Sequence, residues 1–195
     1  MQHNRYIVTG LHKHNRFTIL DGNGNKVGDF GGYPYRDEEE KKVDGFVLGD
    51  VYQGKLAASP RRNRFVQAIY KARILTFYEQ SGEHWNLVKE IQESFPKYKY
   101  NSPAIETDTP IGYLDVCATE KYVYALYSGK NYRDDKEAAF SGYTIEVYGW
   151  DGTLQKRYLS DVPLKAIEVS KDDGSLYAIA YHPDPVLVQF TLFGQ

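Results

Sequence analysis

The chain has a single cysteine and a single methionine among its 195 residues. One cysteine excludes an internal disulfide, and it leaves both a reducing and an oxidising compartment open. Cys117 lies in an apolar run, residues 114–118, that is typical of a strand. We therefore expect a buried thiol without chemical reactivity.

The sequence also lacks a long apolar run and an excess of either charge. No run approaches the roughly 18 apolar residues of a membrane-spanning helix, so we expect no transmembrane segment. Residues 1–5 carry no apolar segment of the kind found in signal peptides. The 24 basic and 26 acidic side chains give a formal net charge of −2. Because nucleic-acid binding needs a clustered basic face, we expect no nucleic-acid partner.

Helix-forming sequence is scarce as well, whereas aromatic residues are abundant. Only residues 37–42 have helical composition, and this stretch is too short and too polar to bury one face. Aromatic residues make up 15% of the chain, and the chain has 18 tyrosines. Tyrosine and phenylalanine favour strands, so the composition predicts an all-β fold.

A strand–turn module with a core aromatic recurs four times, at residues 16–22, 74–78, 144–152 and 186–192. Short strands in groups of four, separated by turns of Gly, Asp, Asn and Pro such as the one predicted at residues 22–25, are typical of β-propeller blades. We expect a single propeller domain with blades at about residues 5–34, 43–96, 111–160 and 161–195. The two middle blades are complete and the outer two lack one strand each. The chain is therefore interpreted as part of a six-bladed ring, with a closed four-bladed ring as the alternative.

Several segments resemble one known family, most clearly residues 121–129 (KYVYALYSG). Residues 51–54, 112–116, 145–152 and 175–181 fit the same pattern. Together they resemble the TolB-like six-bladed propeller-like family of bacterial proteins, over about the C-terminal two-thirds of a typical member. The resemblance implies a propeller fold and a periplasmic or cell-envelope location. It implies no catalytic residue.

Candidate ligand-binding residues lie mainly in the three long loops, residues 35–54, 97–110 and 130–142, because long loops on a regular scaffold often carry function. Tyr98 and Tyr100, beside two lysines, and Tyr132 could stack on sugars or peptides; packing onto the scaffold is the alternative. Arg61 and Arg62, in a turn, could bind an anion, and a solvated turn is the alternative.

Metal ligands are the second class of candidate. His182 and Asp184 could form a metal or acid–base pair, although two neighbouring prolines also indicate a rigid turn. His12 and His14 share one face of an extended segment, but no third ligand is near in sequence. The acidic runs at residues 37–40 and 133–137 lack the spacing of a calcium loop, and both are interpreted as solvated loops. We expect no cofactor, with Ca²⁺ as the one candidate.

No motif identifies a reaction, since the Gly-x-Ser-x-Gly elbow of serine hydrolases is absent. The sequence therefore favours a non-catalytic binding or scaffold module for a protein, peptide or carbohydrate ligand. The alternative is a metal-dependent hydrolase or lyase that acts at the mouth of the propeller. Open sheet edges would invite pairing with another chain, so self-association is a further expectation.

Overall fold

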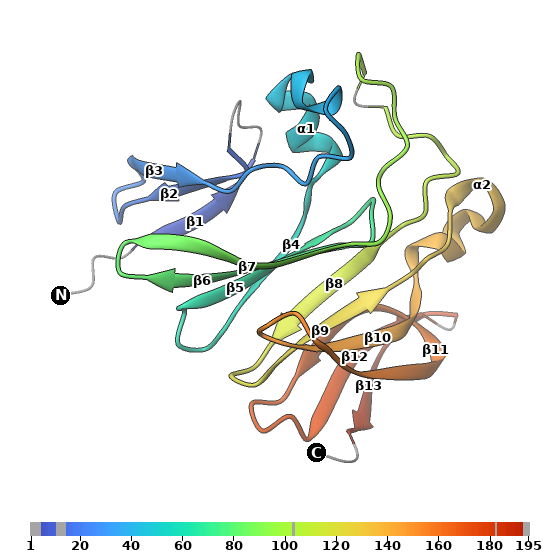
Figure 1. Cartoon of the computed structure of the whole chain (residues 1–195). Coiled ribbons are helices and arrows are strands. Elements are labelled where there is room, and N and C mark those ends of the chain that lie inside the picture. Colours follow the sequence, from blue (N-terminus) through green and yellow to red (C-terminus); the bar gives the residue numbers. More distant parts are fainter. Residues whose placement is uncertain (1–4, 11–14, 103, 182, 193–195) are drawn as a thin grey trace. The chain divides into compact units, whose positions relative to one another are not determined.

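The computed structural model describes residues 5–10, 15–102, 104–181 and 183–192. The all-β prediction is confirmed, because this part of the chain forms thirteen strands and only short helices (Figure 1). The fold divides into two compact units. The first unit comprises Met1–Gln53 and Pro96–Glu106, and the second comprises Gly54–Phe95 and Thr107–Gln195.

The first unit contains a three-stranded antiparallel sheet. Its strands are β1 (Tyr6–Thr9), β2 (Phe17–Leu20) and β3 (Lys26–Phe30), in the order β1-β2-β3. The turn predicted at residues 22–25 joins β2 to β3. Asp21 Oδ1 accepts hydrogen bonds from the amides of Asn23 and Asn25, and Gly24 has a φ of +83° that favours glycine. The turn prediction is confirmed.

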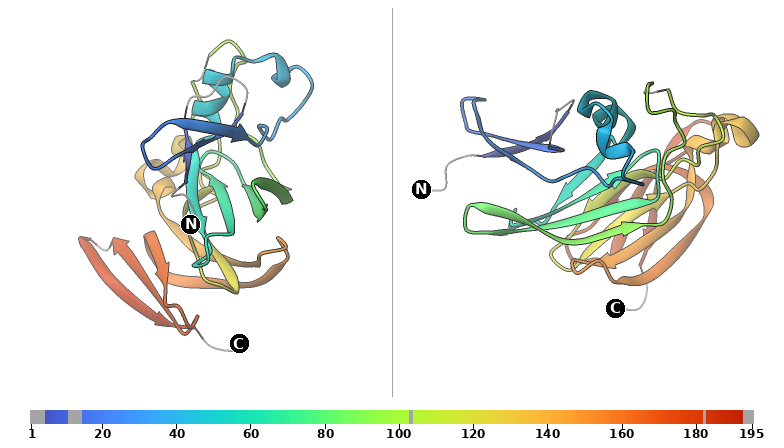
Figure 2. Two further views of the ribbon diagram at one scale, coloured as in Figure 1. Left: turned by 90° about the vertical axis from the view of Figure 1, so that its left-hand side faces the viewer. Right: turned by 45° about the horizontal axis from the view of Figure 1, so that its top comes forward.

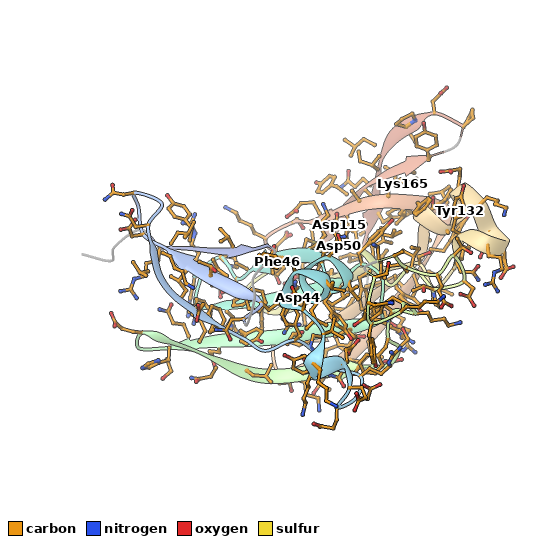
Figure 3. The ribbon with its side chains drawn as sticks, turned by 90° about the horizontal axis from the view of Figure 1, so that it is seen from above. Asp44, Phe46, Asp50, Asp115, Tyr132 and Lys165 are labelled. Atoms are coloured by element: carbon orange, nitrogen blue, oxygen red, sulfur yellow. The ribbon has the colours of Figure 1, made fainter. Side chains whose placement is uncertain are left out.

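Short helices occupy the loop that follows β3. A 3-10 turn spans Glu40–Lys42, and helix α1 spans Gly45–Val51. Asp44 caps α1 by accepting a hydrogen bond from the Phe46 amide at 2.8 Å, and Figure 3 labels both residues. The helix buries Leu48 and Val51. Within the described residues, no helix is both long enough and apolar enough to cross a membrane.

The second unit begins with a four-stranded antiparallel meander. Its strands are β4 (Gly54–Ala58), β5 (Arg64–Ile69), β6 (Ile74–Ser81) and β7 (His84–Gln92). Each strand pairs with the next one along the chain. This is the four-strand composition expected for a complete blade.

Six further strands form one continuous sheet in the second unit. They are β8 (Tyr113–Ala118), β9 (Tyr122–Tyr127), β10 (Gly142–Gly149), β11 (Leu154–Val169), β12 (Ser175–Tyr181) and β13 (Pro185–Thr191). The first half of β11 pairs with β10, and its second half pairs with β12. The sequence predicts two separate strands here, because one expected blade ends at residue 160 and the next begins at residue 161. The structure instead has one long strand that passes from one group of strands to the next (Figure 1).

Helix α2 (Tyr132–Asp135) and a 3-10 turn (Lys136–Phe140) fill the connection between β9 and β10. Asn131 caps α2, since its side chain accepts a hydrogen bond from the Asp134 amide at 3.1 Å. The loop between these strands is therefore ordered by local hydrogen bonds.

Two apolar layers hold the second unit together. One lies between the β4–β7 sheet and β8–β10, and it contains Val66, Ala68, Leu75, Phe77, Val123 and Tyr148. The other lies between β8–β10 and β11–β13, and it contains Tyr124, Leu126, Ile145, Val147, Leu176 and Ala178. Cys117 is buried in the second layer, and burial raises the pKa of its thiol. The prediction of a buried thiol is confirmed.

Candidate functional site

Two of the tyrosines selected from the sequence lie in one cluster of polar and aromatic side chains in the first unit. We call it the Arg36 cluster; its members are Arg36, Asp37, Glu40, Tyr52, Tyr98 and Tyr100. They come from the loop after β3, from the end of α1 and from the segment Pro96–Glu106. That segment is closed on itself, because the Glu106 amide donates to the Lys97 carbonyl at 2.8 Å. Two of the predicted loops thus meet at this cluster.

The fully buried carboxylate of Glu40 organises the cluster. It accepts hydrogen bonds from the Tyr98 hydroxyl at 2.6 Å, from the Tyr52 hydroxyl at 2.7 Å and from the Arg36 amide at 2.6 Å. Burial and the hydrogen bond to this carboxylate raise the pKa of both phenols, so both remain hydrogen-bond donors at neutral pH. The interpretation of residues 37–40 as a solvated acidic run is wrong for Glu40, because a buried carboxylate requires such donors.

Arg36 and Tyr100 form the solvent-facing part of the cluster. The Arg36 guanidinium lies 5.1 Å from the ring centre of Tyr100 and 5.9 Å from that of Tyr98. The Tyr100 hydroxyl donates to Asp37 Oδ2 at 2.5 Å, and this hydrogen bond lowers the pKa of Asp37. The Arg36 side chain keeps 34% of its surface exposed. A cation held against two aromatic rings is thereby presented to solvent in a fixed orientation.

Tyr98 itself is 6% exposed, so its ring is not an open stacking surface. From its sequence, Tyr98 is expected to be an exposed loop residue, with packing onto the scaffold as the alternative. The structure shows the packed alternative. Tyr100 is half-buried, and Lys97 and Lys99 are exposed beside it.

The other candidate ligand residues lie in the second unit, at opposite ends of its strands. Arg61 and Arg62 belong to the β4–β5 turn, where Arg62 has a φ of +57° and the Arg61 amide donates to Glu120 in the β8–β9 turn. Tyr132 lies on α2 at the other end of β9, packed near Phe140 (Figure 3). The structure therefore does not bring Arg61 and Tyr132 together, and their binding roles stay predictions.

Among His12, His14, His182 and Asp184, only Asp184 lies in the described part of the chain. His182, like His12 and His14, lies outside the described residues. Asp184 is exposed in the connection between β12 and β13. Across the described part of the chain, no three His, Cys, Asp or Glu side chains are grouped closely enough to hold a metal ion. The pairing of His182 with Asp184 stays a prediction.

A second buried carboxylate, which the sequence analysis did not select, lies in the second unit. We call its surroundings the Glu146 clamp; the members are Arg73, Glu93, Tyr113, Glu146, Tyr148 and Arg157. Glu146 alternates with the core residues Ile145 and Val147 on β10. Because both faces of this strand are buried, its one acidic residue had to be buried too. An acidic residue within a strand that is apolar on both faces was therefore the sequence signal for this buried carboxylate.

Four side chains hold the Glu146 carboxylate. Tyr148 donates at 2.8 Å, Tyr113 at 3.0 Å and Arg157 Nε at 3.0 Å, and Arg73 Nη2 is also bonded to it. Burial alone would raise the pKa of Glu146, but the hydrogen bonds and the nearby arginine charge outweigh it and lower that pKa. These contacts are all internal to the second unit, so the clamp joins its strands.

Substitution of Tyr98 by phenylalanine tests whether Glu40 needs its phenol donors. We expect Tyr98→Phe to destabilise the first unit by about 1.5–3 kcal/mol, because a buried charged acceptor loses one donor. Tyr100→Phe, which removes a hydrogen bond at the surface, should cost less than about 1 kcal/mol. Hydrogen exchange of the α1 amides is the measurement. Equal protection in the two variants would contradict the role assigned to Glu40.

Comparisons with known proteins agree with the architecture. A family model described as TolB-like 6-blade propeller-like matches residues 1–172. No curated protein matches the chain. Among solved structures, the chain is similar to the β-propeller domain of Cps50 (Swd1) from Myceliophteria thermophila, with a TM-score of 0.53 and 10% identity. The match covers 98% of this chain and 55% of that chain.

At 10% identity the likeness to the solved structure shows the fold alone. It confirms the propeller-like fold class predicted from the strand repeat, for a chain that spans about half the length of the solved domain. The family match covers most of the chain and confirms the resemblance drawn from residues 121–129 and the related segments. The chain belongs to the TolB-like 6-blade propeller-like family.

Proposed function

We propose that the protein is a non-catalytic binding module that takes a protein or peptide partner at the Arg36 cluster. The propeller fold supports a binding or scaffold role in general. The observation that carries the proposal is the Arg36 guanidinium beside the rings of Tyr100 and Tyr98, with the buried Glu40 accepting hydrogen bonds from the Tyr98 hydroxyl and the Arg36 backbone amide. The proposal includes a location in the periplasm or cell envelope. The association of the family with that compartment supports a partner found there.

Arginine and tyrosine are the residue types that contribute most to protein–protein binding. Their contribution is largest where little side-chain freedom is lost on binding. Here Tyr100 is fixed by its hydrogen bond to Asp37, and Arg36 is fixed by the two rings and by the Pro96 carbonyl. Much of the side-chain ordering that binding requires is therefore already present in the unbound protein.

A protein partner is favoured over a carbohydrate by the same geometry. Sugars stack on open aromatic faces. The ring of Tyr98 is buried, and Arg36 lies over the ring of Tyr100. The exposed groups that remain are a guanidinium, a phenol edge and two lysines, which suit carboxylate and carbonyl acceptors on a polypeptide. No observation favours the metal-dependent hydrolase or lyase.

Photo-crosslinking tests this proposal. Benzoylphenylalanine placed at position 100, in a cell-envelope extract, is expected to give an adduct with one protein. Arg36→Ala in the same chain should weaken that binding by about 30-fold, the effect of losing about 2 kcal/mol at a central contact. The control position is Tyr143 in the second unit, an exposed tyrosine that, like Tyr100, has a cation over its ring, here Lys130. Identical adducts from positions 100 and 143 would contradict the proposal.

A further inference from the structure

Four turns of the described chain share one hydrogen-bond geometry. In each turn the amide of the fourth residue donates to the carbonyl of the first, and the fourth residue has a positive φ. The turns span residues 21–24, 59–62, 149–152 and 170–173, and their fourth residues are Gly24, Arg62, Gly152 and Asp173. A positive φ at this position favours glycine, because the Cβ of any other residue is brought too close to the backbone.

Asp173 and Arg62 depart from this preference in different ways. Asp173 is buried, and its carboxylate accepts a hydrogen bond from the Tyr124 hydroxyl at 3.0 Å, so the fold itself uses this side chain. Arg62 is exposed and has a φ of +57°. Its side chain makes no hydrogen bond, ion pair or ring contact with any residue that the structure describes. Contacts within this part of the chain therefore do not account for a strained arginine here, and strained residues are concentrated at functional sites.

Arg62 belongs to a group of cations on two adjacent turns of the second unit. The β4–β5 turn carries Arg61 and Arg62, and the β8–β9 turn carries Lys121; all three are exposed. The two turns lie next to each other, at the ends of the teal and yellow strands in Figure 2, and the Arg61 amide donates to Glu120 Oε1 at 2.9 Å. We call Arg61, Arg62 and Lys121 the turn cations.

The Glu120 carboxylate between these turns is bound by its neighbours and neutralises only part of the charge. Arg64 Nη2 lies 3.4 Å from it, and the same guanidinium lies 4.9 Å from the centre of the Trp150 ring. Arg61 Nε is 3.8 Å from Glu120, a loose ion pair for a side chain that is 81% exposed. Residues 59–64 and 119–122 together carry four basic side chains and one acidic side chain, a net charge of +3.

We propose that the turn cations bind a phosphate group. Guanidinium groups match the oxygen geometry of both phosphate and carboxylate. The net charge of +3 favours the more highly charged of the two, since a phosphate monoester carries about −1.5 to −2 at pH 7. Such a group occurs in soluble phosphate esters and in lipid headgroups. The site is separate from the Arg36 cluster and does not depend on the protein partner proposed there.

Arg62→Gly tests the proposal because its expected effects on binding and on stability are opposite. Binding of phenyl phosphate to the full chain, followed through the Nε–Hε resonance of Arg61, should weaken about tenfold, the effect of losing one charged hydrogen bond. The unfolding temperature should rise by about 2–4 °C, because glycine adopts this φ without strain. Lys121→Gln should weaken the same binding without raising the unfolding temperature. Arg133→Gln, which removes an exposed charge from α2 in the same unit, is the matched control and should leave the binding unchanged.

Two comparisons identify the class and the source of the ligand. At equal ionic strength, phenyl phosphate should bind at least about tenfold more tightly than acetate, and equal binding of the two would overturn the assignment to phosphate. Sedimentation with phosphatidic acid vesicles that requires Arg62 supports a lipid headgroup, whereas binding of phenyl phosphate alone supports a soluble ester. An Arg62→Gly chain that gains stability but keeps full affinity for phenyl phosphate would overturn the proposal.

Discussion

Replacement of Glu146 by alanine is expected to lower the unfolding free energy by about 3–5 kcal/mol, the usual effect of removing one partner from a buried ion pair. Glu146 is 1% exposed and receives hydrogen bonds from Tyr113 and Tyr148 and the charges of Arg73 and Arg157. Without it, two phenols lose their acceptor. The Arg73 side chain, 19% exposed, then keeps its ion pair with the surface carboxylate of Glu93 and its contact with the Tyr127 ring.

Glu93→Ala is the matched control, because Glu93 contacts the same arginine at 2.6 Å but is 45% exposed. It should cost less than about 1 kcal/mol. Urea unfolding followed by circular dichroism measures both variants. Since the folded-state pKa of Glu146 lies below its usual value of 4.5, its stabilisation is present above that pH. It is lost as the pH falls through the folded-state pKa. A cost for Glu146→Ala that does not shrink in acid would contradict the clamp.

Substitution of Gly112 by alanine is expected to destabilise the second unit by about 3 kcal/mol, the upper end of the typical range for overpacking, because the added atom would meet backbone. An added Cβ would lie 1.8 Å from the carbonyl oxygen of Ala72 and 2.4 Å from its carbonyl carbon. Both are backbone atoms, so no side-chain rotation relieves the clash. The Gly112 amide also donates to the Tyr70 carbonyl at 2.7 Å, which holds the start of β8 against the β5–β6 turn.

Gly54→Ala should behave similarly, because its added Cβ would lie 2.0 Å from the Ala68 carbonyl oxygen. Gly32→Ala is the control, since no atom lies within 4 Å of the added methyl group. Its effect should stay within about 0.5 kcal/mol. Thermal unfolding measured by calorimetry compares the three proteins. If Gly112→Ala unfolded at the wild-type temperature, the close backbone approach at β8 would be contradicted.

The strands were largely predictable because each carries its own signal. Residues 113–119, 122–128 and 175–181 are apolar runs bounded by turn residues, and strands β8, β9 and β12 fall within them. Within residues 121–129, the odd spacing of Tyr124 and Tyr127 places their side chains on opposite faces of a strand. In the structure Tyr124 packs in one apolar layer and Tyr127 against the other. Local pattern was sufficient for these elements.

The candidate site was less predictable because it depends on contacts between distant segments. Tyr98 and Tyr100 could be selected for their composition, but their partners Arg36 and Glu40 lie about sixty residues earlier. Nothing local distinguishes Glu40 from the exposed Glu38 and Glu39 beside it. Helix α1 was missed for a related reason, since its seven residues bury only Gly45, Leu48 and Val51. The Asp44 cap was its clearest sequence signal.

Strand β11 has a mechanical consequence for the second unit. One uninterrupted backbone is hydrogen-bonded to β10 along its first half and to β12 along its second half. A force applied to β12 or β13 is therefore transmitted directly into β10 without passing through a flexible linker. The two groups of strands share this one strand, so we expect them to open together rather than as two separate cooperative units.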